Sequence, residues 1–203
     1  TLLLQKEIET KGASEFNLKA SASAAGPYSL DYMYGYITGQ VEYPAPYFTA
    51  YLIDAYISLG LVSNPVSDFF REPYAGRIPG LFDGSRSSSN INSYLSVKTA
   101  DLLTQEFKDG YLSHSKFASF KSALEANSVK VSDWQMTTPT RLFHGEEDLI
   151  VPLALSQKTM ADLKAAGTAD SKIHMVTLPK IGHTDGVLPI GVSTILWFME
   201  INQ

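Results

Sequence analysis

Two short apolar segments, each followed by a turn that carries an ionisable side chain, constrain this chain more than any other feature. The first covers residues 141–143, breaks at Gly145 into an acidic turn, and leads to Pro152, where a helix is expected to begin. The second covers residues 173–178 and leads to a turn that contains His183. This pattern predicts two consecutive parallel strands that are joined by one helix.

Asp148 and His183 each lie just past the end of one of these strands. A right-handed strand–helix–strand unit brings those two ends to the same edge of a parallel sheet. A carboxylate and an imidazole placed there can form the acid–histidine half of a catalytic triad. In such a pair the acid orients the imidazole, and the imidazole takes a proton from a nucleophile and returns it to the leaving group.

Other ionisable residues near the two turns leave alternatives open. Glu146 and Glu147 are rivals for the role of the acid, although Asp148 directly precedes the apolar residues that lead into the helix. A third carboxylate, Asp185, could orient the histidine turn or compete for the imidazole, and we expect it to orient the turn. We expect His144 to be structural, because it lies within the end of the first strand. A metal site formed by His144, Asp148 and His183 is an alternative, but their spacing matches no metal-binding motif.

The acid and the histidine resemble the last two triad members of the α/β-hydrolase superfamily, whose order is serine, acid, histidine. Residues 145–152, Gly-Glu-Glu-Asp-Leu-Ile-Val-Pro, are similar to the acid turn of that family. Residues 181–186, Ile-Gly-His-Thr-Asp-Gly, are similar to its histidine loop. The sequence departs from the family pattern in one respect, since no Gly-x-Ser-x-Gly nucleophile motif occurs in the 203 residues.

The first thirty residues resemble the segment that follows the nucleophile in secreted bacterial lipases and esterases of this superfamily. Residues 1–12 are expected to form a helix, and residues 16–24 a strand of small side chains that ends at Gly26-Pro27. This resemblance implies that the chain is the C-terminal part of such a hydrolase and begins a few residues after the serine. The N-terminal part of the same protein is then its expected partner.

Composition narrows the possible partners and locations. A length of 203 residues with 44% hydrophobic residues is enough for one domain with a substantial core. A net charge of −5 argues against nucleic acid as a partner. No stretch approaches the length and apolarity of a transmembrane helix. Eleven tyrosines against sixteen Lys and Arg favour a secreted, periplasmic or cell-surface protein.

Residues 31–136 differ from the flanking segments in composition and in predicted secondary structure. Tyrosines crowd the beginning of this block, and helices are predicted at residues 47–59, 97–107 and 115–126, with no alternating strand pattern. The block therefore predicts a helical insertion between two strands of the sheet. The family resemblance implies that it is a cap or lid over the C-terminal edge of the sheet.

The last part of the chain returns to alternating strands and helices. Residues 137–203 are expected to form hydrolase core together with residues 1–30. The final helix, residues 187–201, carries four apolar residues on one face: Leu188, Val192, Ile195 and Met199. The predicted fold class is α/β, with the C-terminal strands of an α/β-hydrolase parallel sheet and an inserted helical cap.

The family resemblance implies a serine ester hydrolase that acts through an acyl-enzyme on small-molecule or lipid esters, with no cofactor. A peptidase or a carbohydrate-ester hydrolase of the same fold is an alternative. A further alternative is that the protein has no nucleophile and that the chain is a non-catalytic binding module. Ser21 and Ser23 lie on a predicted strand rather than on a nucleophile turn. Thr1 would be an N-terminal nucleophile only if it opened a strand, but it precedes a helical sequence.

Overall fold

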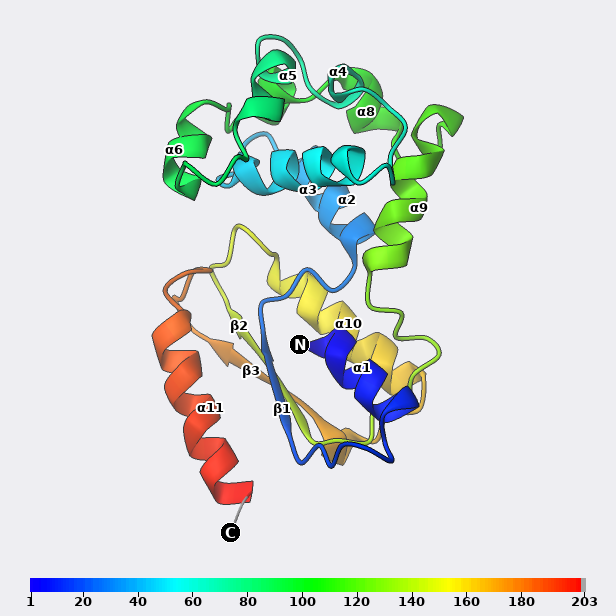
Figure 1. Ribbon diagram of the computed structural model, residues 1–203. Coiled ribbons are helices and arrows are strands. Elements are labelled where there is room, and N and C mark those ends of the chain that lie inside the picture. The colour runs from blue at the N-terminus through cyan, green and yellow to red at the C-terminus, as the bar shows by residue number, and fades with distance from the viewer. Residues whose placement is uncertain (202–203) are drawn as a thin grey trace. The chain divides into compact units, whose positions relative to one another are not determined.

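The computed structural model describes residues 1–201, which divide into two compact units (Figure 1). Residues 1–29 and 128–201 form the sheet unit, which contains a three-stranded parallel sheet and three long helices. Residues 30–127 form the helical unit. In the sequence, the helical unit is thus inserted between the first and second strands of the sheet.

The second boundary between the units lies earlier in the chain than the sequence suggested. It follows Asn127 rather than residue 136. Trp134 and Met136 are both buried in the same apolar cluster as Leu142, which is a residue of the central strand. The segment before that strand therefore packs with the sheet, because its large apolar side chains complete the core on one face.

The three strands are parallel and follow the order β1-β2-β3. They are β1 (Ser21–Ala24), β2 (Thr140–Gly145) and β3 (Ile173–Leu178). Thr140 pairs with Ser21 on one side and with Ile173 on the other, so the strands start in register. The first strand is shorter than the 16–24 predicted from its composition, because residues 16–20 make no ladder with β2.

Two helices, α1 (Leu2–Lys11) and α10 (Leu153–Ala165), lie on the same face of the sheet (Figure 1). Gln5 of the first helix donates to the hydroxyl of Thr140 over 2.8 Å. Leu163 of the second helix is fully buried in the cluster below that face. A short 3-10 turn, η3 (Asp170–Lys172), then leads into β3.

The last helix, α11 (Val187–Ile201), covers the opposite face of the sheet (Figure 1). Trp197 is buried there, and the guanidinium of Arg141 lies 4.4 Å from the centre of its ring. The four apolar residues predicted to share a face do so, but that face is exposed, with relative exposures between 50% and 76%: Leu188, Val192, Ile195 and Met199. The sheet unit therefore carries an apolar helix face that the described part of the chain leaves uncovered.

The helical unit packs around a cluster of aromatic side chains. Phe69, Phe107, Phe117 and Phe120 are all fully buried, and in five of their six pairs the ring centres lie between 5.0 and 5.6 Å apart. Edge-to-face contacts of this kind add to the free energy gained by burying the rings. Its helices, most of them short, are α2 (Leu30–Gly39), α3 (Pro46–Ser58), α4 (Val66–Phe69), α5 (Tyr74–Arg77), η1 (Ile78–Gly80), α6 (Ser88–Ser93), α7 (Thr99–Leu102), α8 (Gln105–Gly110), η2 (Ser115–Phe117) and α9 (Ala118–Asn127).

The single helix predicted at residues 97–107 is in fact two helices, α7 and α8. The chain is extended at Leu103, which forms an isolated bridge with Phe70. The next residue, Thr104, then begins a new helix, because its hydroxyl oxygen accepts from the N–H of Phe107. Side-chain capping and the pairing with Phe70 together outweigh the helical pattern of the segment.

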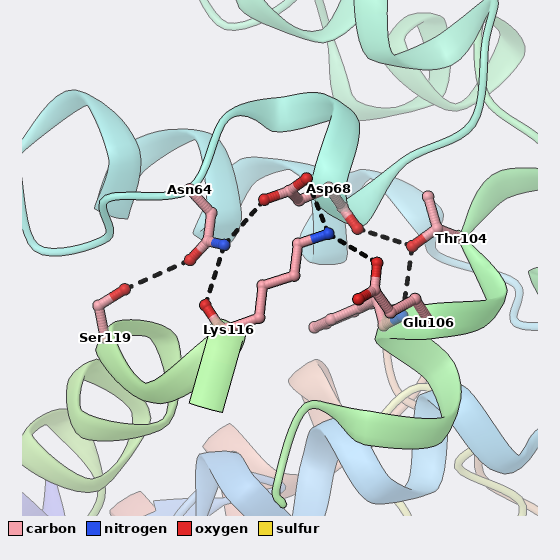
Figure 2. A network of polar contacts seen from close by, with 7 residues as sticks. Asn64, Asp68, Thr104, Glu106, Lys116 and Ser119 are labelled. Atoms are coloured by element: carbon pink, nitrogen blue, oxygen red, sulfur yellow. Dashed lines mark hydrogen bonds and ion pairs between the residues drawn. The ribbon is translucent and has the colours of Figure 1, made fainter. Parts of the chain in front are cut away.

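A polar network joins three of these helical segments at the surface of the helical unit (Figure 2). The Lys116 ammonium lies 2.6 Å from a carboxylate oxygen of Glu106 and 3.1 Å from one of Asp68. Asn64 donates to the same Asp68 carboxylate and to the carbonyl of Lys116. Thr104 donates to the carbonyl of Asp68, so the network connects α4, α8 and η2.

None of the helices within residues 1–201 combines the length and the apolarity that a bilayer-spanning helix needs.

Candidate active site

Asp148 sits in a tight turn directly after β2 and is buried. Its Oδ1 accepts hydrogen bonds from the backbone N–H groups of Ile150 and Val151, both at 2.9 Å. An aspartate that accepts from N–H groups two and three residues later stabilises its own turn. This turn therefore fixes Oδ1 and directs Oδ2 away from the turn backbone.

His183 follows β3 and reaches that free oxygen. Its Nδ1 lies 2.7 Å from Oδ2 of Asp148, although the two residues are 35 positions apart. The carboxylate oxygen can only accept, so Nδ1 carries the proton. Nε2 has no hydrogen-bond partner among residues 1–201, and the side chain is 26% exposed. The structure thus brings together the acid and the histidine expected from the sequence, with the second ring nitrogen available.

The histidine loop is held against the acid turn by backbone contacts. The N–H of Glu146 donates to the carbonyl of Leu178, and the N–H of Glu147 donates to the carbonyl of Ile181, both over 3.0 Å. These bonds extend the pairing of β2 and β3 past the ends of the strands. The separation between the two turns is therefore set by main-chain geometry, which leaves little freedom for the acid–histidine distance.

Within residues 1–201, no hydrogen bond or ion pair joins the rival carboxylates to the imidazole. The side chains of Glu146 and Glu147 are exposed, whereas Asp148 is buried. Asp185 is also exposed, and within the described chain His183 has its hydrogen bond with Asp148. Geometry therefore favours the aspartate of the turn over both glutamates as the partner of the histidine.

Burial alone would raise the pKa of the Asp148 carboxyl, because a charged group loses hydration there. Hydrogen bonds from His144, His183 and the Val151 N–H favour the ionised form and outweigh this effect. Together they hold the pKa of Asp148 well below its usual range. The Asp148 side chain is therefore a charged carboxylate in the folded protein at neutral pH.

A second histidine, His144, lies on the inner side of the same carboxylate. Its ring is fully buried, with Nδ1 2.7 Å from the hydroxyl of Ser156 and Nε2 2.8 Å from the carbonyl of Val151. Nε2 is also 3.4 Å from Oδ2 of Asp148. Sequence reasoning missed Ser156, since a serine in the first turns of a helix gives no indication that it will meet a strand histidine.

Ser156, His144 and Asp148 are the residue types of a triad, but they cannot act as one. The serine and the histidine are both 0% exposed, and the aspartate is 5% exposed. An ester could not reach a nucleophile in that position. The pair of Asp148 and His183 differs because its imidazole is partly open to solvent.

The remaining candidates from the sequence are placed away from this chemistry. Ser23 lies buried on β1, where Tyr28 donates to its hydroxyl over 2.9 Å, and Ser21 is buried on the same strand. Thr1 is exposed and precedes α1, with its carbonyl accepting from the N–H of Gln5. Among residues 1–201, no group of three or more His, Cys, Asp or Glu side chains is arranged to hold a metal ion.

Comparison with known proteins supports the fold of the chain. No protein-family model and no curated protein matches the sequence at a significant level. Among solved structures, the rice cell wall degrading esterase LipA from Xanthomonas oryzae matches 95% of this chain, with a TM-score of 0.75 and 24% identity. A protein named as a hydrolase from Legionella pneumophila matches 100% of it, with a TM-score of 0.86 and 17% identity.

Candida antarctica lipase A in its closed state matches 98% of this chain, with a TM-score of 0.64 and 14% identity. The three matched proteins are longer, since the chain covers 51%, 53% and 45% of them respectively. The chain thus spans about half the length of the solved structures that it matches. Its fold is α/β-hydrolase-like.

Proposed function

We propose that the protein containing this chain is a serine carboxylic ester hydrolase in which His183 is the general base and acid and Asp148 orients it. One observation carries this proposal: His183 Nδ1 lies 2.7 Å from a buried carboxylate, while the partly exposed ring keeps Nε2 available. The α/β-hydrolase-like fold supports it, because such a pair at the strand ends fits the acid and histidine positions of that fold.

The geometry supports a specific path for the proton. Since Nδ1–H is bound by Asp148, Nε2 is the unprotonated nitrogen and can accept the proton of a serine hydroxyl. The serine oxygen then attacks the ester carbonyl, and the buried carboxylate stabilises the imidazolium that forms. His183 returns the proton to the departing alcohol, which leaves an acyl-serine. A water molecule repeats the sequence and releases the acid.

The serine itself is proposed to come from a segment outside these 203 residues, in the N-terminal part of the same protein. The chain has no Gly-x-Ser-x-Gly motif, and Ser23 and Ser156 are buried in other hydrogen bonds. Within residues 1–201, β1 pairs only with β2, so its outer edge is open for a further strand. The backbone N–H groups that stabilise the oxyanion would come from the same proposed N-terminal part.

Small-molecule or lipid esters are the proposed substrates, and the reaction needs no cofactor. The neighbours named as an esterase and a lipase support this class over peptides. An ester on a carbohydrate is the nearest alternative within the same chemistry. The helical unit, inserted between β1 and β2, is proposed as the cap of the fold. A secreted, periplasmic or cell-surface location is proposed for the protein.

The test is turnover of a nitrophenyl ester by the intact protein, combined with labelling by a serine-directed fluorophosphonate. We expect His183→Ala to abolish turnover. The matched control is His174→Ala, which removes an exposed histidine of β3 and should leave turnover unchanged. A protein that neither takes the label nor turns over the ester would instead be a binding module, and the proposal would be wrong.

A further inference from the structure

The buried carboxylate of Asp148 has an imidazole on each side. His183 approaches Oδ2 from the partly exposed side at 2.7 Å, and His144 approaches the same oxygen from the core at 3.4 Å. Only the first of these imidazoles has a part in the proposed reaction. The second has no access to substrate, because its ring is fully buried.

The direction in which His144 donates a hydrogen bond follows from its partners. The carbonyl of Val151, 2.8 Å from Nε2, can only accept a hydrogen bond, so Nε2 carries a proton. Nδ1 lies 2.7 Å from the Ser156 hydroxyl, which can donate to it. Both ring nitrogens thus have a hydrogen-bond partner. This arrangement directs the Nε2–H toward the acid turn.

Through that N–H, His144 holds the acid in two ways. It binds the carbonyl of Val151, and the N–H of the same Val151 donates to Oδ1 of Asp148 over 2.9 Å. It also lies 3.4 Å from Oδ2, where its positive end faces the negative charge. A side chain that anchors the turn backbone and attracts the second oxygen restricts rotation of the carboxylate about its side-chain bonds.

We propose that His144 is a positioning residue, a buried imidazole that keeps Asp148 aligned with His183. The inference rests on the proposed function and adds to it a residue that never contacts substrate. It differs from the expectation that His144 is only structural. A purely structural histidine would affect folding stability, whereas a positioning histidine also affects how well His183 accepts a proton in the transition state.

Alignment of this kind acts on the chemical step rather than on substrate binding. A misplacement of about 1 Å in a catalytic group can cost about a hundredfold in rate. The loss should therefore appear in kcat, with KM little changed, since interactions made only in the transition state raise kcat. The hydrogen bond of His183 can also be followed directly, because its Nδ1 proton gives a far-downfield NMR resonance when held by a carboxylate.

The experiment compares two replacements of His144 in the intact protein. His144→Gln keeps an N–H donor near the position of Nε2, whereas His144→Leu keeps none. We expect the Leu variant to lose about 10- to 100-fold in kcat and to shift or lose the Nδ1 resonance of His183. The Gln variant should recover most of both. If the Leu variant does not fold, His144→Asn, with a donor near Nδ1 only, replaces it.

Thr159→Ala is the matched control for stability. Thr159 is buried on α10, one turn after Ser156, and its hydroxyl donates to the carbonyl of Leu155 rather than to either histidine. The control should lower the free energy of unfolding but leave kcat and the resonance unchanged. If His144→Leu behaves like the control at equal loss of stability, or if Gln and Leu behave alike, the positioning role is wrong.

The two readouts separate this inference from the proposed function. If the resonance responds to His144 but no ester is hydrolysed, the positioning of the pair holds and the proposed reaction is wrong. If His183→Ala abolishes hydrolysis but His144→Leu changes neither kcat nor the resonance, the reaction holds and the positioning role is wrong.

Discussion

Gly145 at the end of β2 lies directly against the backbone carbonyl of Ile181 in the histidine loop. A Cβ at residue 145 would overlap that carbonyl oxygen and would also lie 3.1 Å from the carbonyl of Gly182. The obstacle is main chain rather than a movable side chain. Glycine is therefore required here because the histidine loop passes too close to the strand for any other residue.

Gly145→Ala should accordingly separate the two turns. We expect the histidine loop to move, the hydrogen bond between Asp148 and His183 to lengthen, and kcat to fall by about a hundredfold. The measurement is ester turnover together with the Nδ1 proton resonance of His183. Gly191→Ala is the control, because a Cβ at that position in α11 meets no atom within 4 Å. Equal activity of both variants would show that the loop tolerates the displacement.

Replacement of the acid distinguishes the three carboxylates of the turn. Asp148→Asn keeps the shape of the side chain but lets Nδ1 of His183 lose its acceptor, so the wrong tautomer becomes accessible. In a serine protease triad the same change costs about 10⁴-fold in kcat, and a similar loss is expected here. Glu147→Gln should remain within about tenfold of the unaltered protein, since its side chain is exposed and away from the imidazole. A dead Glu147 variant with an active Asp148 variant would reverse the assignment of the acid.

The acid–histidine geometry could be predicted from the sequence because its causes are local. A strand, an acidic turn and a helix-starting proline are adjacent in the sequence, and parallel topology then brings the next strand end to the same edge. Asp148 makes its turn bonds to Ile150 and Val151, only two and three residues away. Ser156 and His144 meet across the packing of α10 on β2, which no spacing rule describes.

The apolar pattern of α11 did not determine which face of this helix packs against the sheet. The helix is apolar on most of its surface, so the residues that share one face do not indicate which face meets the sheet. The buried position is Trp197, whose ring lies over Arg141 of β2. The exposed face has the composition of a core, and only the packing of the folded chain distinguishes it from the face that is buried.

Substitutions on the two faces of α11 should therefore differ in their effect on the 203-residue chain. Trp197→Ala removes a buried ring and its contact with Arg141, and we expect it to lower the free energy of unfolding by about 3–5 kcal/mol. Ile195→Ala removes a side chain that is 61% exposed and should cost no more than about 0.5 kcal/mol. Urea unfolding measures both changes. Comparable losses would mean that the apolar face packs against the sheet.

Glu9 of α1 joins this helix to the segment before β2. Its carboxylate accepts from Trp134 Nε1 at 3.0 Å, from the N–H groups of Thr137 and Thr138 at 2.9 and 3.1 Å, and from the amide of Gln5 at 2.9 Å. Burial would raise the pKa of Glu9, but the hydrogen bonds from Gln5, Thr137 and Thr138 outweigh it and lower the pKa. These donors favour the charged carboxylate, so protonation weakens the attachment of α1.

The lowered pKa of Glu9 determines how the free energy of unfolding changes with pH. A group with a lower pKa in the folded state contributes stability above its unfolded pKa, which is about 4.3 for glutamate, and loses this contribution as the pH falls through the folded pKa. Glu9→Gln places an amide N–H₂ against N–H donors and should cost about 1–3 kcal/mol at neutral pH. The difference between the variant and the unaltered chain should shrink as the pH falls below about 4. Urea unfolding at a series of pH values from neutral to acidic measures this difference in the free energy of unfolding.

Glu7→Gln is the control for this pH dependence, because Glu7 is exposed on the same helix and, within residues 1–201, its side chain pairs only with Lys11, one turn away. Its loss should be no more than about 0.5 kcal/mol, as for other exposed pairs at this spacing. A constant difference for Glu9→Gln from neutral to acidic pH would contradict the argument, since it would mean that ionisation of Glu9 does not contribute to the attachment of α1. A Glu7 variant with the same loss and the same pH dependence would assign the effect to the net charge of the helix instead of to the bonds that Glu9 accepts.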